Sequence, residues 1–340
     1  MLSPVWWLLS CIGSYVFENL EPREPMPARE LPTGLNSLSA KECGGCHDAI
    51  YREWKDSMMG RAWTDPVFQV DFQEQGELYV CRNCHTPLVE QQPELVVGLS
   101  SVRPVTAITE PNPHFQPELV DEGVTCVACH LDAGQIVGPH EDVSPPHAWR
   151  VGDVTGSCER CHQMPPPPFW KLERDVADTH RENERWQALT GRDEGCVDCH
   201  MPAVVRPLVA GYPERPGRAH TFVGSWDREM LRSAVSMRIE QGMLLVENHA
   251  GHSVPTAEPS HRLRLEWAGV DADEVWVRDI HARKEHGDTT LREGEVRAVP
   301  IPKGATGATL VYERLALMSE AVVEALPPEE RRVVLAEVAW

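Results

Sequence analysis

A pentapeptide of the pattern Cys-x-x-Cys-His occurs five times and constrains this chain more than any other feature. The copies span residues 43–47, 81–85, 126–130, 158–162 and 196–200 and use ten of the eleven cysteines. On one helical turn, positions i, i+3 and i+4 lie on the same face. Two thiols there can form thioethers to the vinyl groups of a haem, and the next imidazole meets the iron from the same side. Each copy is therefore typical of a c-type haem attachment site.

The repeats predict five covalently attached haems c. Zinc sites and disulfides are the competing interpretations, but structural zinc usually pairs two Cys-x-x-Cys knuckles. Five knuckles, each with its own adjacent histidine, do not pair off. The predicted thioether-forming residues are Cys43, Cys46, Cys81, Cys84, Cys126, Cys129, Cys158, Cys161, Cys196 and Cys199. The predicted proximal iron ligands are His47, His85, His130, His162 and His200.

The charge of the chain limits its partners. Its 340 residues carry 32 basic and 52 acidic side chains, a formal net charge of -20. This charge argues against nucleic acid as a partner and favours steering towards basic redox partner proteins, although solubility alone also explains acidic stretches. The 29 prolines indicate a loop-rich fold. In such a fold haem supplies much of the buried apolar surface, since a segment of about 40 residues builds little core alone.

The start of the chain is apolar. Residues 1–17 carry no charged side chain, which is typical of an export signal or a membrane anchor. Leu8-Leu9-Ser10-Cys11 loosely resembles a lipobox, which would make Cys11 a lipidated residue. A cleaved signal, a short spanning helix and a buried helix are the other interpretations. We therefore predict a signal or anchor at 1–20, a Pro-rich linker at 21–37, and a periplasmic or cell-surface protein associated with the membrane through its N-terminus.

Several segments resemble a known family. Residues 43–63, CGGCHDAIYREWKDSMMGRAW, are similar to the opening of the multihaem cytochrome c family that includes cytochrome c-554 and relatives of hydroxylamine oxidoreductase. The family residues Tyr51, Trp54, Ser57 and Ala62 match, and a distal histidine of the family falls on Met59. Residues 122–130, 196–202 and 220–224 are also similar. The resemblance covers about residues 38–260 and implies a pentahaem cytochrome domain, which we place at 38–237.

A low-spin haem needs a sixth ligand, which must come from outside the repeats. His252 lies in a loop, 248–259, that resembles a family loop whose histidine ligates haem. Met59 could bind iron and raise the reduction potential relative to a pair of histidines, or could only fill the core. The sequence does not show which distal residue serves which haem, and His147 and His114 are reserves. The predicted distal ligands are Met59, His140, His180, His220 and His252.

The periodicity changes after an amphipathic helix expected at 227–237. Short alternating stretches at 243–247, 261–267, 274–280, 295–301 and 309–312 predict a small antiparallel β-sandwich over 238–316. Helices are expected at 319–326 and 327–340, within a C-terminal segment at 317–340. The predicted fold class is α+β: a loop- and helix-rich haem domain with little regular structure, followed by the sandwich and C-terminal helices.

These features favour electron transfer by a pentahaem c-type cytochrome in a periplasmic or extracytoplasmic respiratory chain. No catalytic residues are predicted. The alternative is a multihaem oxidoreductase that acts on a small nitrogen or sulfur compound at one open-site haem. A structural or filament-forming subunit is a third hypothesis. A specialised nitrite reductase is expected to carry a Cys-x-x-Cys-Lys site, and the sequence has none.

Overall fold

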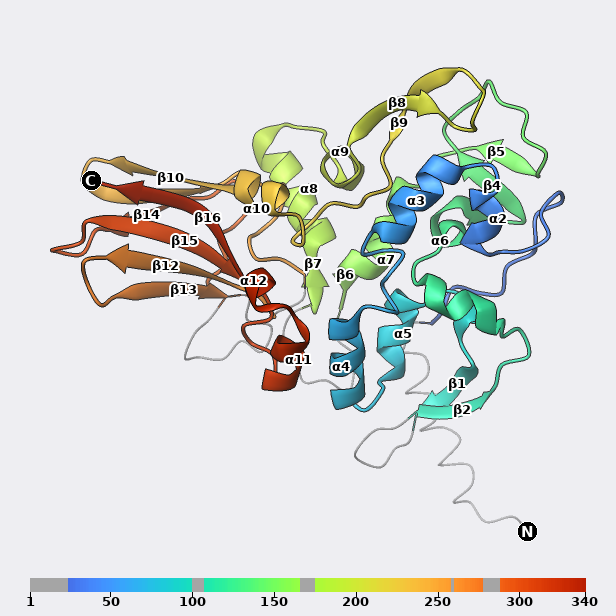
Figure 1. Ribbon diagram of the computed structural model, residues 1–340, viewed down its shortest axis with the longest axis horizontal. Helices are drawn as coiled ribbons and strands as arrows, with labels where there is room; N and C mark the ends of the chain where they lie inside the picture. Colours follow the sequence, from blue (N-terminus) through green and yellow to red (C-terminus); the bar gives the residue numbers. More distant parts are fainter. Residues whose placement is uncertain (1–23, 100–106, 166–174, 258–259, 278–287) are drawn as a thin grey trace, which may run out of the picture. The chain divides into compact units, whose positions relative to one another are not determined.

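A computed structural model describes residues 24–99, 107–165, 175–257, 260–277 and 288–340 (Figure 1). The predicted anchor at 1–17 lies outside the described residues. The chain divides into two compact units, the first made of 1–157, 167–170 and 204–221 and the second of 158–166, 171–203 and 222–340. Three Cys-x-x-Cys-His repeats fall in the first unit and two in the second, so the units do not follow the boundary expected at residue 237. Across the described ranges, no helix combines the length and apolar character that crossing a bilayer requires.

The first unit combines short helices with small sheets. Strands β1 and β2 form an antiparallel hairpin, β3, β4 and β5 form a three-stranded sheet, and β8 pairs with β9. The helical elements are α2 (Ala40–Gly44), α3 (Asp48–Asp56), α4 (Pro66–Glu74), α5 (Tyr79–His85), η1 (Val89–Gln91), η2 (Pro117–Glu122), α6 (Cys126–His130) and η3 (Thr155–Cys158). The strands are β1 (Glu94–Leu99), β2 (Ala107–Pro111), β3 (Leu131–Asp132), β4 (Gln135–Gly138), β5 (Trp149–Val151), β8 (Ala203–Pro207) and β9 (Glu214–Arg218).

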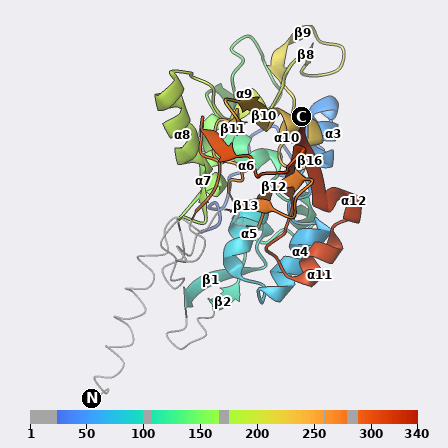
Figure 2. The same cartoon turned by 90° about the vertical axis from the view of Figure 1, so that its left-hand side faces the viewer.

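Helix α4 lies side by side with α5 in both Figure 1 and Figure 2. The start of α4 is fixed by Pro66 at its first position and by the Asp65 carboxylate, which accepts the amide hydrogen of Phe68 at 3.3 Å. Both are favoured helix-start residues. Phe68 and Phe72 lie four residues apart and therefore share the helix face that contacts α5.

The predicted linker, of which residues 24–37 are described, is held against the first unit at Met26. The Met26 amide donates to the Pro87 carbonyl at 2.6 Å, and the Met26 carbonyl accepts from Val89 at 2.9 Å. Met26 also packs against a small core that includes Leu88 and Val127. Met26 therefore ties this segment to the first unit, while Glu30, Leu31, Thr33 and Gly34 are exposed.

The second unit carries the remaining elements. Its helices are α7 (Glu159–His162), α8 (Thr179–Thr190), α9 (Cys196–His200), α10 (Arg228–Ala234), α11 (Glu320–Ala325) and α12 (Pro328–Arg331). Its strands are β6 (Gln163–Met164), β7 (Ala177–Asp178), β10 (Val235–Glu240), β11 (Met243–Asn248), β12 (Arg262–Ala268), β13 (Asp273–Val277), β14 (Val296–Pro300), β15 (Gly307–Glu313) and β16 (Arg332–Ala339).

Two antiparallel sheets form the expected sandwich in this unit. One has the strand order β10-β11-β14 and the other β13-β12-β15-β16 (Figure 1). Leu244 and Val246 of β11 alternate inward, as do Leu263 and Leu265 of β12, and all four are fully buried in one core. This alternation is the period-two pattern of a strand with one buried face. The α+β fold class predicted from the sequence is confirmed.

Two helix predictions near the sandwich need correction. The helix expected at 327–340 is wrong beyond its first turn, because α12 ends at Arg331 and residues 332–339 form β16. Val333 and Leu335 alternate into the core, so pairing with β15 prevails over the helix-start signal before it. The helix expected at 227–237 ends at Ala234, where β10 begins and pairs with β11.

Candidate functional site

Every Cys-x-x-Cys-His repeat lies on a short helical turn, as its spacing predicts. Helices α5, α6 and α9 each contain one complete repeat. The repeat at 43–47 runs across the C-terminal end of α2, and the repeat at 158–162 runs from the last residue of η3 through α7. Both thiols and the imidazole of a repeat thus project from one turn of backbone.

Backbone carbonyls orient four of the five motif histidines. Their Nδ1 atoms lie at hydrogen-bond distance from a carbonyl oxygen, which places the proton on Nδ1 and leaves Nε2 with a free lone pair for a metal. The pairs are His47 with Leu208 at 3.0 Å, His85 with Ala62 at 2.6 Å, His130 with Val137 at 2.8 Å and His200 with Val223 at 2.5 Å.

Two predicted distal histidines face motif histidines. The ring of His220 lies 6.1 Å from that of His130, centroid to centroid, with 29° between their planes. The ring of His252 lies 6.1 Å from that of His200, at 12°. With a metal–nitrogen bond of about 2 Å and roughly 1 Å from nitrogen to ring centre, two imidazoles that share one metal have centroids about 6 Å apart.

The two distal rings are anchored in the same way as the motif histidines. The Nδ1 atom of His220 lies 3.1 Å from the Arg218 carbonyl oxygen, and that of His252 lies 2.9 Å from the Ser253 carbonyl oxygen. Paired thiols on a helical turn and imidazoles at this separation fit a haem c. His130 and His220 would hold the iron of one such haem, and His200 and His252 the iron of another. When bound, the haem supplies reversible one-electron chemistry.

Four of the five repeats form two pairs, in each of which the first cysteines of two repeats lie next to each other. In the first unit, the thiols of Cys43 and Cys126 lie at hydrogen-bond distance, an interaction that lowers the pKa of Cys43 and raises that of Cys126 well above its usual value. In the second unit, a hydrogen bond with Cys158 is the main cause that lowers the pKa of Cys196 to about 6. Each unit therefore contains one adjacent pair of attachment sites.

The repeat on α5 lies in an aromatic cluster that the sequence analysis did not single out. Phe68 stacks on the His85 ring with 3.6 Å between centroids and 8° between planes. The Arg82 guanidinium lies 4.7 Å from the centre of the Trp63 ring and 5.1 Å from that of Phe72, within cation–π range. The cluster could have been predicted in part from the sequence, because Phe68 and Phe72 are four residues apart and so share one face of a helix.

The other distal candidates are not opposed to a motif imidazole in the ring contacts of the described residues. The Met59 carbonyl accepts the Val124 amide hydrogen at 3.0 Å. The half-buried His140 lies in the loop between β4 and β5. His180 lies on α8, with Nδ1 3.9 Å from Glu184. Thioether formation and ligation by all the candidate residues stay predictions.

A buried polar network holds the loop that carries His252. The Asn248 amide group donates to the carbonyl of His252 at 2.8 Å. The Ser253 amide donates to Glu182 of α8 at 3.2 Å, and the Ser253 hydroxyl donates to Glu293 at 2.9 Å. The four residues that build this network, Asn248, Ser253, Glu182 and Glu293, are each less than a tenth exposed. These residues are polar and far apart in the sequence, so they form no periodic pattern from which this network could have been predicted.

Comparison with known proteins gives a family match to part of the chain and a structural match to most of it. Residues 42–131 match the family model for cytochrome c554 and c-prime. The fold is similar to the crystal structure of a penta-heme cytochrome c552 from Thermochromatium tepidum, with a TM-score of 0.57 and 20% sequence identity. That match covers 89% of this chain and 98% of the other chain.

Proposed function

We propose that this chain is a multihaem cytochrome c similar to the cytochrome c554 family, that it carries five covalently attached haems, and that it transfers electrons in an extracytoplasmic respiratory chain. Two pairs of facing imidazoles carry the proposal, His130 with His220 and His200 with His252, and in each pair the ring centroids are 6.1 Å apart. A haem iron held by both histidines of such a pair would have no position left for a substrate, which suits electron transfer.

The number of haems follows from the number of repeats. All five Cys-x-x-Cys-His repeats adopt a helical turn, and the structurally similar protein is described as a penta-heme cytochrome. The adjacent sites within each unit would let electrons pass between neighbouring haems. Burial, hydrogen bonds and axial ligands would set the potential of each haem.

The location and partners are part of the same proposal. Export through the apolar residues 1–17, as a signal or an anchor, would place the protein in the periplasm or on the cell surface. A net charge of -20 favours donor and acceptor proteins with basic docking surfaces. Long-range attraction of this kind weakens as salt is added, so electron transfer to such a partner should slow at higher ionic strength.

The decisive experiment is expression with haem-maturation machinery, followed by intact mass, a redox titration and electron paramagnetic resonance of the oxidised protein. We expect five haems per chain and mainly low-spin ferric signals. Four or fewer haems in the fully matured protein, or zinc in their place, would contradict the proposal. A native high-spin haem that also turned over a small nitrogen or sulfur compound would favour the alternative oxidoreductase.

A further inference from the structure

We propose that Glu53 is a positioning residue: with Arg206 it fixes His220 in the orientation in which its imidazole faces His130. This inference rests on the proposed function, because the orientation matters only if iron lies between the two rings. Glu53 belongs to α3 and Arg206 to β8, while His220 follows β9, so residues distant in the sequence meet here within the first unit.

The Glu53 carboxylate makes two kinds of contact. Both of its oxygens accept from the Arg206 guanidinium: Oε1 from Nη1 in a short contact, and Oε2 from Nη2 at 2.8 Å. Oε2 also accepts the backbone amide hydrogen of His220 at 2.8 Å. A bidentate pair between arginine and a carboxylate is stronger and more directional than a single hydrogen bond, so the backbone at His220 is held by a fixed acceptor.

Arg206 extends the same control to the imidazole ring. Its Nη2 donates to the Arg218 carbonyl at 3.2 Å, and that carbonyl also accepts from Nδ1 of His220 at 3.1 Å. Glu53 thus orients the main chain of His220 directly and orients its ring through Arg206 and Arg218. The hydrogen bond at Nδ1 places the proton on that atom, so Nε2 is the ring nitrogen suited to bind a metal.

We call the ion pair of Glu53 and Arg206 the Glu53 clamp. The clamp is partly shielded from water, and its two charges cancel. The side chains of Glu53 and Arg206 are 25% and 18% exposed. Burial alone would raise the pKa of Glu53, but hydrogen bonds from Arg206 and from the His220 amide hold it below its usual value. The bidentate contact with the guanidinium is that of an ionised carboxylate, whose charge offsets that of Arg206 close to His220.

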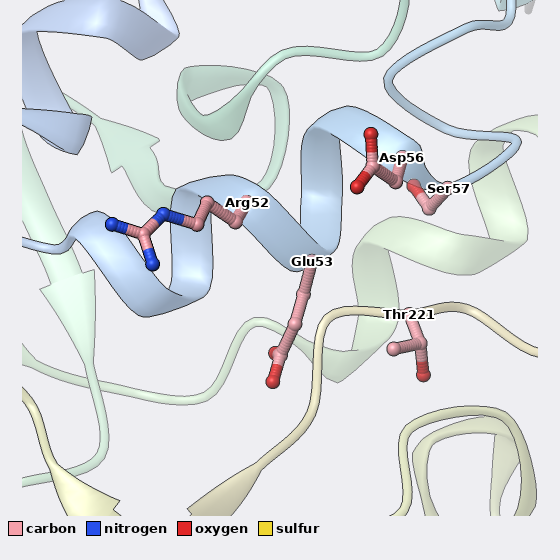
Figure 3. Close-up of a pocket in the computed structure, with 5 residues that line it drawn as sticks. All are labelled: Arg52, Glu53, Asp56, Ser57 and Thr221. Carbon is pink, nitrogen blue, oxygen red and sulfur yellow. The ribbon is translucent and has the colours of Figure 1, made fainter.

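Glu53 lines a surface pocket of about 340 Å³, and another acidic residue that lines this pocket can serve as a matched control (Figure 3). Glu53 reaches from α3 towards the segment that carries Thr221, whereas Arg52 points away from it and pairs with Asp48. Asp56 lines the same pocket three residues after Glu53 on the same helix. Asp56→Asn removes an equal charge from an exposed position and isolates the effect of the clamp.

The test compares Glu53→Gln, Glu53→Ala and Arg206→Lys with Asp56→Asn in the haem-loaded protein. Glu53→Gln keeps an acceptor for the His220 amide but leaves Arg206 uncompensated, so one component of the redox titration should move to a more positive potential without a change of spin state. Glu53→Ala should convert one haem's share of the low-spin ferric signal to high spin, and added imidazole should restore it. Arg206→Lys should give a smaller conversion, and Asp56→Asn should match the wild type.

The outcomes separate this inference from the proposed function. If the Glu53 and Arg206 variants bind all their haems and give the same spectra and titration as Asp56→Asn, the positioning role of Glu53 is overturned. The proposed function would stand. If Glu53→Ala does not fold, Glu53→Gln and Arg206→Lys decide the matter, because each replaces the side chain by one of similar size and leaves no cavity. A wild-type protein without haem would overturn the proposed function and this inference together.

Discussion

Asn248 should be the most sensitive polar residue of the loop that carries His252. Its side chain is 3% exposed, and its amide group donates to the carbonyls of His252, Leu291 and Arg292 at 2.8, 3.1 and 2.8 Å. Its Oδ1 accepts the Ala250 amide hydrogen at 2.8 Å. Asn248→Ala removes all four hydrogen bonds at once.

The structure shows which groups lose their only described partner in that variant. The Leu291 carbonyl still accepts from Val254, and the Arg292 carbonyl still accepts from Glu295. The His252 carbonyl and the Ala250 amide are left without Asn248. A buried group left unsatisfied costs about 1–3 kcal/mol. These two groups are half-buried, so each falls in the lower half of that range and the local stability of the loop should fall by about 3 kcal/mol.

Hydrogen–deuterium exchange of the haem-loaded protein measures this loss. A free energy of about 3 kcal/mol corresponds to roughly a hundredfold faster exchange of the amides that open with the loop. Peptides that cover β11 and residues 249–256 should show this acceleration, whereas peptides from the first unit should not. The released His252 should also reduce the low-spin signal of one haem.

Two further variants control the interpretation. Asn183→Ala also removes hydrogen bonds, to the carbonyls of Gly251 at 3.2 Å and Glu194 at 3.3 Å, but from a partly exposed side chain. It should cost less than about 1 kcal/mol. Asn248→Asp keeps the acceptor but loses the donors, and should be at least as damaging as Asn248→Ala. Exchange within about threefold of wild type in Asn248→Ala would refute the reasoning.

Three other variants test separate features. Met59→His should lower one midpoint potential, because imidazole would replace thioether at iron, and an unchanged redox titration would remove Met59 from the ligands. Gly123→Ala should cost at least about 2 kcal/mol, since Gly123 has a φ of +57° and an added Cβ would lie 2.7 Å from the Met59 carbonyl oxygen; an unshifted thermal midpoint would contradict this. Burial lowers the pKa of His261 to about 4, with a smaller effect of Arg314. Because the unfolded state then binds the extra proton first, stability should fall as pH drops from about 6.5 to 4, and His261→Gln should flatten that slope in denaturant unfolding; an equal slope in both proteins would refute it.

The sequence alone determined the features whose geometry is local. Five residues fix a Cys-x-x-Cys-His turn, because the thiols and the imidazole are brought together by a single turn of helix. Alternation likewise located β11, β12, β14 and β15, since one face of each strand must be buried. The predicted resemblance to multihaem cytochromes c also rested on such local motifs and is confirmed by the matched segment and the fold.

The tertiary structure alone decided which distant residues meet. That His220 faces His130 and His252 faces His200 depends on how loops pack, and loop packing leaves no periodic pattern in the sequence. The same holds for the Glu53 clamp and the Asn248 network. At the C-terminus, local signals favoured a helix after Pro327, but residues 332–339 bury Val333 and Leu335 and complete the ladder of β15. Long-range pairing therefore outweighed a helical preference that lasts only one turn.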